Sequence, residues 1–191
     1  DLLDSLEDAD DATREEAAKA LAELANPATL DALIGACGDE FWSVRTRAGW
    51  GVAKIGGPKA IEALIVLFND PIMEVRNEAV AAVVSLGAGQ LDRLLAAMKD
   101  ERWRVREHAA KACGDLHDSG AVDALIFACR DRDGAVKSAA AEALGKIGDP
   151  KAIPALVKLF RDSSKIVRET AGIALVAIGQ PSVDLLLETL K

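Results

Sequence analysis

The sequence predicts an all-α protein, a superhelix (solenoid) of about six repeats in which each repeat is a pair of antiparallel helices. Two observations carry this prediction: a two-residue signal that returns every 30 or 31 residues, and apolar residues at helical spacing within each period. The clearest copy spans residues 133–162. The signal, called the anchor pair below, stands at Thr13-Arg14, Val44-Arg45, Val75-Arg76, Val105-Arg106, Val136-Lys137 and Val167-Arg168.

The first helix of each repeat carries the anchor pair and is called the anchor helix. Counted from the first residue of the pair, apolar residues fall at positions 0, +4, +7, +8 and +11, which is the period of an amphipathic helix. Position +4 is alanine in every copy, so neighbouring helices can approach to about 8 Å. The predicted anchor helices are 11–24, 42–55, 73–86, 103–116, 134–147 and 165–178.

The second helix of each repeat, called the connecting helix, follows a turn that contains glycine or proline. Glycine suits the residue that ends a helix, and proline suits the first turn of the next one. Residues 1–8 are predicted to be the second helix of an incomplete repeat, and residues 1–191 a single domain with repeats starting near 11, 42, 73, 103, 134 and 165. The predicted connecting helices are 28–38, 59–69, 90–99, 120–130, 151–161 and 182–190.

These elements resemble HEAT-like repeats of the short, roughly thirty-residue phycobilisome-lyase type. The resemblance rests on the repeated aspartate, the Val-Arg pair, the Ala-rich helix that closes in Ile-Gly, and the Asp-Pro-x-Ala that follows. It implies that the anchor helices line the concave surface of the superhelix. It does not fix a function, because repeats of this type serve in scaffolds, chaperone-like lyase subunits, hydroxylases and artificial binders.

Charge and composition exclude several classes of partner. The net charge is −8, and no basic stripe follows the exposed positions of the anchor helices, so neither nucleic acid nor a membrane surface is expected as a partner. No apolar run is long enough to span a membrane, and no secretory leader opens the chain. Cys37, Cys113 and Cys129 occupy core positions, and three layers separate Cys37 from Cys129, too far for a disulfide, which favours a cytoplasmic location.

No catalytic residue, metal site or cofactor is predicted. The aspartate and the arginine six residues later recur in most repeats, as in Asp70 with Arg76, and such a repeated pair is typical of a structural ladder. Glu107-His108 reverses the His-Glu pairs that hold iron in deoxyhypusine hydroxylase and occurs once, so a metal would lack ligands. His108 is therefore predicted to lie on the surface of the concave face.

The candidate binding site is a group of large side chains that the helical period turns away from the core. Trp42, Trp50 and Trp103 stand where other repeats carry small or charged residues. Ala81 lies between them in the repeat pattern and predicts a hollow, with Arg47 and Arg104 supplying positive charge for a carboxylate of the partner. The predicted site comprises Trp42, Thr46, Arg47, Trp50, Met73, Asn77, Ala81, Trp103, Arg104, Glu107, His108 and Lys111.

The sequence thus predicts a non-catalytic scaffold that binds a protein or peptide on its concave face. A bilin lyase subunit or similar chaperone-like protein is one alternative, and an artificial binder built on a repeat framework is another. Leucines crowd both ends of the chain, with Leu2, Leu3 and Leu6 at the first and Leu185, Leu186, Leu187 and Leu190 at the last. This predicts either a longer natural chain or end-to-end self-association.

Overall fold

The computed structural model describes residues 1–182, which contain helices and turns and no strand. They form two compact units, Asp1–Arg93 and Leu94 onward, and the boundary falls within a connecting helix. Each unit is described by itself below. The predicted helix 182–190, with its four leucines, lies outside the described residues from 183 on.

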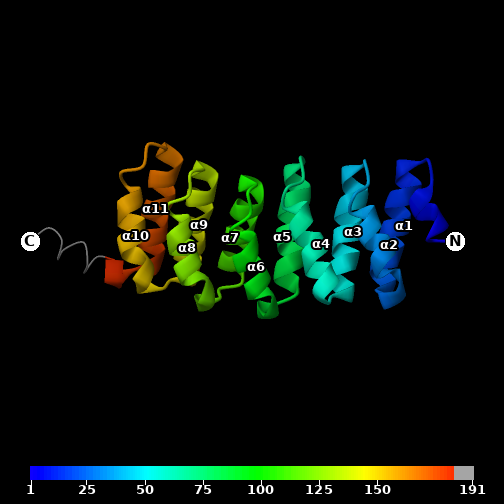
Figure 1. Ribbon diagram of the computed structural model, residues 1–191, viewed down its shortest axis with the longest axis horizontal. Helices are drawn as coiled ribbons and strands as arrows, with labels where there is room; N and C mark the ends of the chain where they lie inside the picture. Colours follow the sequence, from blue (N-terminus) through cyan, green and yellow to red (C-terminus); the bar gives the residue numbers. More distant parts are fainter. Residues whose placement is uncertain (183–191) are drawn as a thin grey trace, which may run out of the picture. The chain divides into compact units, whose positions relative to one another are not determined.

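The anchor helices have nearly the predicted bounds (Figure 1). Asp10 caps the first of them by accepting a hydrogen bond from the Thr13 N–H, and Asp133 caps a later one by accepting from Ala135. Two of the six end one residue earlier than predicted. The anchor helices are α1 (Asp11–Leu24), α3 (Trp42–Ile55) and α5 (Met73–Ser85) in the first unit, and α7 (Trp103–Asp115), α9 (Gly134–Ile147) and α11 (Lys165–Ile178) in the second.

The connecting helices are shorter than predicted, because most of them open with a separate 3₁₀ turn. Asn26, Asp118 and Asp149 each accept a hydrogen bond from the backbone N–H two residues later, which fixes this tight turn before the α-helix begins. The turns are η2 (Pro27–Thr29), η3 (Ala88–Gln90), η4 (Ser119–Ala121) and η5 (Pro150–Ala152). The helices are α2 (Leu30–Ala36), α4 (Pro58–Leu67), α6 (Leu91–Ala97), α8 (Val122–Ala128) and α10 (Ile153–Leu159).

The opening segment differs from its prediction as a full helix. Only a 3₁₀ helix, η1 (Asp4–Glu7), forms there. The side chain of Asp1 accepts hydrogen bonds from the backbone N–H groups of Leu3 and Asp4, and this local bonding favours a turn over an α-helix.

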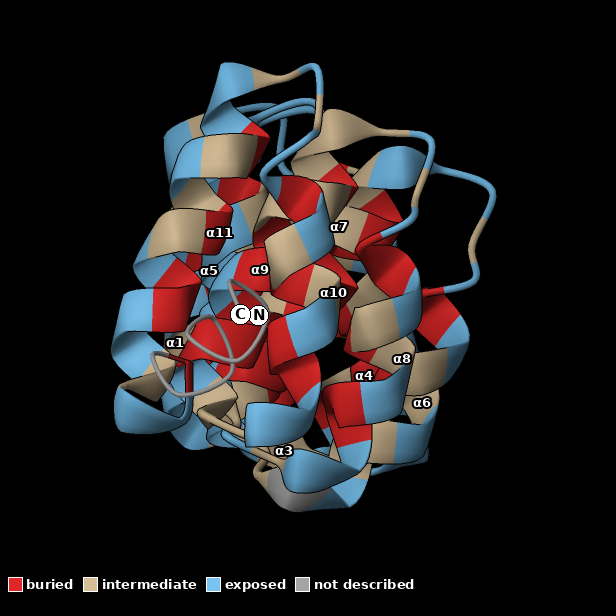
Figure 2. Ribbon diagram, turned by 90° about the vertical axis from the view of Figure 1, so that its left-hand side faces the viewer, coloured by how far each residue is buried: buried red, intermediate tan, exposed pale blue. Residues whose placement is uncertain are grey.

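Within each unit the core lies between the anchor helices and the connecting helices, where buried residues face one another (Figure 2). The alanine at position +4 is at most 3% exposed in all six anchor helices, as predicted. A Cβ atom added to Gly114 would lie 2.7 Å from the Cα atom of Ala143, so α7 and α9 approach each other backbone to backbone. Small residues at these positions therefore set the spacing of the layers.

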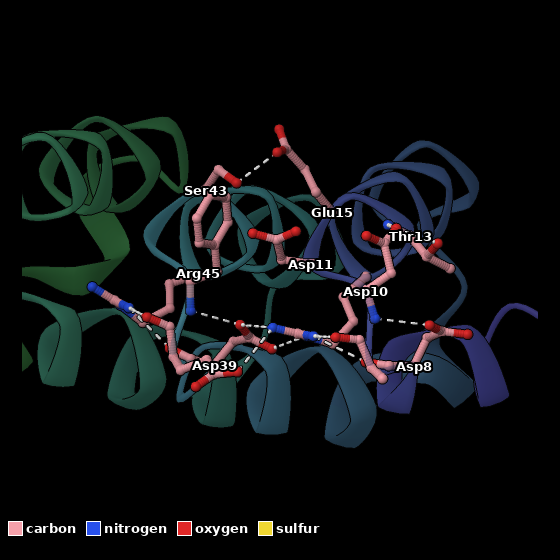
Figure 3. A network of polar contacts seen from close by, with 12 residues as sticks. Asp8, Asp10, Asp11, Thr13, Glu15, Asp39, Ser43 and Arg45 are labelled. Carbon is pink, nitrogen blue, oxygen red and sulfur yellow. Dashed lines mark hydrogen bonds and ion pairs between the residues drawn. The ribbon is translucent and has the colours of Figure 1, made fainter.

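A ladder of ion pairs joins successive layers within each unit, and Figure 3 shows the part of it around Asp39 in the first unit. Arg45 donates from Nε and Nη2 to the two carboxylate oxygens of Asp70, at 2.6 and 2.8 Å, and from Nη1 to the backbone carbonyl of Asp39. Each aspartate of the ladder also accepts the backbone N–H two residues later. The other rungs are Arg14 with Asp39, Arg106 with Asp131, and Lys137 with Asp162. The ladder has a structural role, but its pairs differ from the prediction: each basic residue of these rungs pairs with the aspartate 25 residues later, and Arg76 donates to the backbone carbonyl of Asp70 instead of its carboxylate.

Candidate binding surface

The predicted site residues occupy the side of the anchor helices that points away from the connecting helices. We call this side the open face; it comprises positions −2, +2 and +6 of each anchor helix. In the first unit it is formed by Trp42, Thr46 and Trp50 of α3 and by Met73, Asn77 and Ala81 of α5. In the second unit it includes Trp103, Glu107 and Lys111 of α7. The single predicted hollow joins residues of both units and stays a prediction.

The start of α3 and the start of α5 expose large apolar side chains in the first unit. Trp42 is 45% exposed and Met73 is 56% exposed. The residue before each, Phe41 and Ile72, is exposed as well. Four large apolar side chains at equivalent positions of neighbouring helices form an apolar rim, the kind of surface that partners cover.

Trp50 is less free than Trp42, because it is half-buried and tied to the next helix. Its indole Nε1–H donates to Oε2 of Glu78 on α5 at 2.9 Å. The ring therefore closes the groove between α3 and α5 while keeping its polar atom satisfied. We assign Trp50 a mainly structural role within the predicted site.

Arg47 is already engaged by an acidic side chain of the first repeat. Its Nε lies 3.4 Å from Oε1 of Glu15 on α1, and Glu15 also accepts a hydrogen bond from the Ser43 hydroxyl at 2.6 Å. Arg47 is half-exposed, so a partner carboxylate can still reach it, but it would compete with Glu15.

Trp103 and Arg104 form a stacked pair at the start of α7. The guanidinium carbon of Arg104 lies 4.9 Å from the centre of the Trp103 ring, within the range of a cation–π contact. Trp103 remains 37% exposed, while Nε of Arg104 is buried and makes no hydrogen bond to any described residue. One turn further along α7, Glu107 and Lys111 pair at 2.7 Å, so their charges cancel locally.

His108 does not lie on the surface, and that prediction was wrong. Its side chain is 1% exposed, and its ring Nδ1 lies 2.7 Å from the Arg104 carbonyl, to which it donates. The burial belongs to this repeat and not to position +3 in general, because Glu16, Arg47 and Glu78 are exposed at the equivalent positions of the first three anchor helices. A hydrogen-bonded imidazole can be buried there at low cost.

The open face of the second unit contains a hollow that the sequence analysis missed. It has a volume of about 400 Å³ and lies over the first half of α9. Its floor consists of small residues, Gly134, Ala135, Ser138 and Ala139, and its walls are Glu107 and Lys111 of α7 with Ile166 of α11. The hollow exists because α9 carries glycine and serine where α7 carries Trp103 and Glu107.

A second hollow of about 420 Å³ continues along α9 and α11 and shares Glu142 with the first. Its apolar wall includes Ile173 and Ala177. We call the two hollows together the α9 groove. Ile166 and Ile173 are 66% and 70% exposed, which is costly for side chains of this size unless a partner covers them. The signal in the sequence was glycine at position −2 of one repeat, next to a repeat that carries Trp103 at that position.

Chemistry that would suggest catalysis is sparse in the part of the chain that the structure describes. No group of three or more His, Cys, Asp or Glu side chains there could hold a metal ion. The three cysteines are free thiols, and burial raises the pKa of each thiol to about 12. Such thiols are poor nucleophiles at neutral pH. Among the described helices none is long and apolar enough to cross a membrane.

Comparison with known families supports the architecture. The model of the HEAT repeats family matches residues 1–85, 91–176 and 128–191, which together cover nearly the whole chain. The chain belongs to the HEAT-repeat family. No curated protein matches the sequence at a significant level.

Solved structures with a similar fold include a designed repeat protein. The phycocyanin lyase complex of CpcE and CpcF from Nostoc sp. PCC7120 has a TM-score of 0.61 at 21% identity, covering 78% of this HEAT-repeat chain and 99% of that one. A designed armadillo repeat protein in complex with the peptide (KR)4 has a TM-score of 0.51 at 21% identity, covering 93% and 98%. An engineered protein has a TM-score of 0.53 at 23% identity, covering 93% and 97%. At these identities the likeness concerns the fold alone.

Proposed function

We propose that this HEAT-repeat chain is a non-catalytic scaffold that binds a protein or peptide segment on its open face, with the α9 groove as the principal contact. The groove carries the proposal, because it combines a floor of small residues with exposed Ile166 and Ile173. A hollow of about 400 Å³ falls within the size of pockets that hold ligand groups.

The charges around the α9 groove indicate the chemistry of the partner. Glu107 pairs with Lys111 and Glu142 with Lys146, each at 2.7 Å. Because these walls are neutralised within the chain, the partner segment needs apolar side chains more than charge. Binding should therefore depend only weakly on salt concentration.

Trp42 and Trp103 are proposed as additional contacts on the open faces of their own units. Both are exposed aromatics, the residue type that dominates binding energy at interfaces. A designed armadillo protein of similar fold holds a peptide, which is consistent with this use of a helical repeat array.

The test is a selection of phage-displayed random linear peptides against the intact chain, followed by binding measurements on variants. Gly134→Trp places in α9 the residue that α3 and α7 carry at the same position. A Cβ atom added at Gly134 would meet only the Cγ2 atom of Val167, at 3.9 Å, so the fold should accept the change. We expect selected peptides to bind Gly134→Trp at least about tenfold more weakly, at an unchanged thermal midpoint.

Lys165→Ala serves as the matched control, because Lys165 holds the same position −2 on α11 and does not line the α9 groove. It should leave peptide binding unchanged. If Gly134→Trp binds every selected peptide as well as the original chain does, the α9 groove is not the contact.

A lyase subunit is the second candidate, and it rests on the fold shared with the phycocyanin lyase pair. The buried thiols of this chain would not attach a bilin themselves, since burial raises their pKa to about 12. Titration with a linear tetrapyrrole separates the two functions. A change in bilin absorbance would favour the lyase role, and no change at saturating pigment would remove it.

A further inference from the structure

A larger hollow lies on the other side of the second unit, among the connecting helices. It has a volume of about 800 Å³ and lies between α6 and α8, entirely within residues 95–132. Its apolar lining consists of Leu95, Met98, Ala124, Phe127 and Ala128. We call it the α8 groove. It shares no residue with the α9 groove.

Comparison with the next layer shows why the α8 groove is large. The equivalent hollow between α8 and α10 has a volume of about 270 Å³. There, Leu159 stands where the α8 groove has Ala128, and Lys158 stands where it has Phe127. The smaller alanine opens the groove, and the aromatic ring adds an apolar wall that is 76% exposed.

The rim of the α8 groove has an excess of positive charge, although the chain as a whole has a net charge of −8. Three lining aspartates are engaged within the chain: Asp100 with Arg102, Asp131 with Arg106, and Asp123 with Lys151. Lys99, Arg130 and Arg132 form no ion pair with described residues, and neither does Glu101. The lining itself carries four basic and four acidic side chains, but Arg102 and Lys151 from outside it pair with Asp100 and Asp123, and counting these two partners gives a local surplus of two positive charges.

We propose that the α8 groove is a second binding site, which takes a peptide segment that carries a large apolar side chain beside an aspartate or glutamate. The apolar side chain would fill the space that Ala128 leaves and pack on the ring of Phe127. The neighbouring carboxylate would then face Lys99 and Arg130, where pairing is charge-assisted. This site goes beyond the proposed open-face function and does not depend on it.

The experiment uses the same displayed peptide library on the intact chain and on two variants. Each variant introduces into α8 the residue that α10 carries at the equivalent position. Ala128→Leu fills the groove as Leu159 does, and Phe127→Lys removes the exposed aromatic as Lys158 does. We expect a class of peptides that combines an apolar residue with a nearby acidic residue. This class should lose at least about tenfold in affinity on each variant and keep its affinity for Gly134→Trp.

Charge and stability controls complete the test. Arg130→Glu should weaken the same peptides and remove the salt dependence of their binding, because it reverses one charge of the rim. Lys158→Ala, on α10 outside the α8 groove, should change nothing. Thermal midpoints of Phe127→Lys should match the original chain, since Phe127 is largely exposed; this variant keeps the test valid even if Ala128→Leu unfolds.

Three results would overturn the proposal. One is that no selected peptide is sensitive to Ala128→Leu or to Phe127→Lys. Another is that the sensitive peptides lack an acidic residue. The third is that decanoate, used as a probe, binds the groove while no peptide does, which would make the site one for lipid carboxylates. None of these results tests the proposed binding site on the open face, because that site is tested separately by the loss of binding to Gly134→Trp.

Discussion

The helices α3 and α9 are the middle anchor helices of the two units. They hold the same place in the repeat but carry different side chains on the open face. On the open face α3 presents Trp42 and Trp50, whereas α9 presents Gly134 and Glu142 at the same two positions. The first arrangement gives exposed aromatic rings and the second gives the α9 groove. Buried positions, in contrast, are small or aliphatic in both helices from +4 onward, and the alanine at +4 is 0% exposed in both.

This comparison shows where a repeat protein can change its partner without changing its fold. The core positions of α3 and α9 are fixed by the close approach of neighbouring helices. The positions on the open face are free of that constraint, so the size of the side chains there decides whether the surface forms a ridge or a groove. The two helices also differ in their ladder rung, which is an arginine in α3 and a lysine in α9.

The largest expected effect comes from breaking the rung of α3. Arg45→Ala removes a bidentate partner from Asp70, whose side chain is 5% exposed, and leaves that carboxylate buried and unpaired. We expect a loss of about 3 kcal/mol in the free energy of unfolding, measured by urea denaturation. Lys137→Ala in α9 should cost less, since lysine makes a single bond to its aspartate. Equal losses would contradict this ranking of the rungs.

Acid should weaken the rungs on either side of α9. Burial raises the pKa of Asp131, but hydrogen bonds from Arg106 and from the Asp133 N–H outweigh it and hold that pKa below its usual value. The hydrogen bond from Lys137 likewise lowers the pKa of Asp162. A lowered pKa adds stability that is present above about pH 4, the unfolded value, and is lost as the pH falls through the folded value.

The measurement is the urea midpoint as a function of pH. We expect it to fall steadily below about pH 4, and to fall less steeply in Asp162→Asn, which lacks one of these carboxylates. A midpoint that stays flat below about pH 4 would show that the rungs contribute nothing through ionisation.

Enlarging a buried alanine of α9 should destabilise the protein more than enlarging a residue on the open face of α9. Ala140→Leu overpacks a position that is 0% exposed and should cost about 1–3 kcal/mol. Ser138→Leu, two residues away on the floor of the α9 groove, should cost less because the hollow can receive the larger side chain. Urea denaturation of the two variants gives the comparison, and the reverse order would mean that the faces of α9 are assigned wrongly.

The smallest expected effect separates the two tryptophans of α3. Trp50→Ala removes a half-buried ring and its hydrogen bond to Glu78, and should lower stability by about 1 kcal/mol. Trp42→Ala removes an exposed ring and should leave the thermal midpoint unchanged. If Trp42→Ala lowers the thermal midpoint as much as Trp50→Ala does, Trp42 also stabilises the fold and is not a side chain available only to a partner.

The sequence predicted the anchor helices almost to the residue because their period repeats with little variation. The prediction failed for the direction of one side chain, that of His108. His108 was assigned to the surface, although its side chain is buried and the Arg104 carbonyl accepts a hydrogen bond from its ring, while Arg47 at the equivalent position of α3 is half-exposed. The grooves were also missed, because each depends on a difference in side-chain size between successive layers. An example is Ala128 in one layer and Leu159 at the equivalent position of the next, which no single repeat reveals.

The open face of α9, hollow where α3 is filled, is proposed to bind a peptide segment. This proposal is tested most directly by isothermal titration of one selected peptide into the intact chain and into Gly134→Trp. We expect the affinity to fall at least about tenfold in the variant while both proteins unfold at the same temperature. Equal affinities at equal thermal midpoints would contradict it.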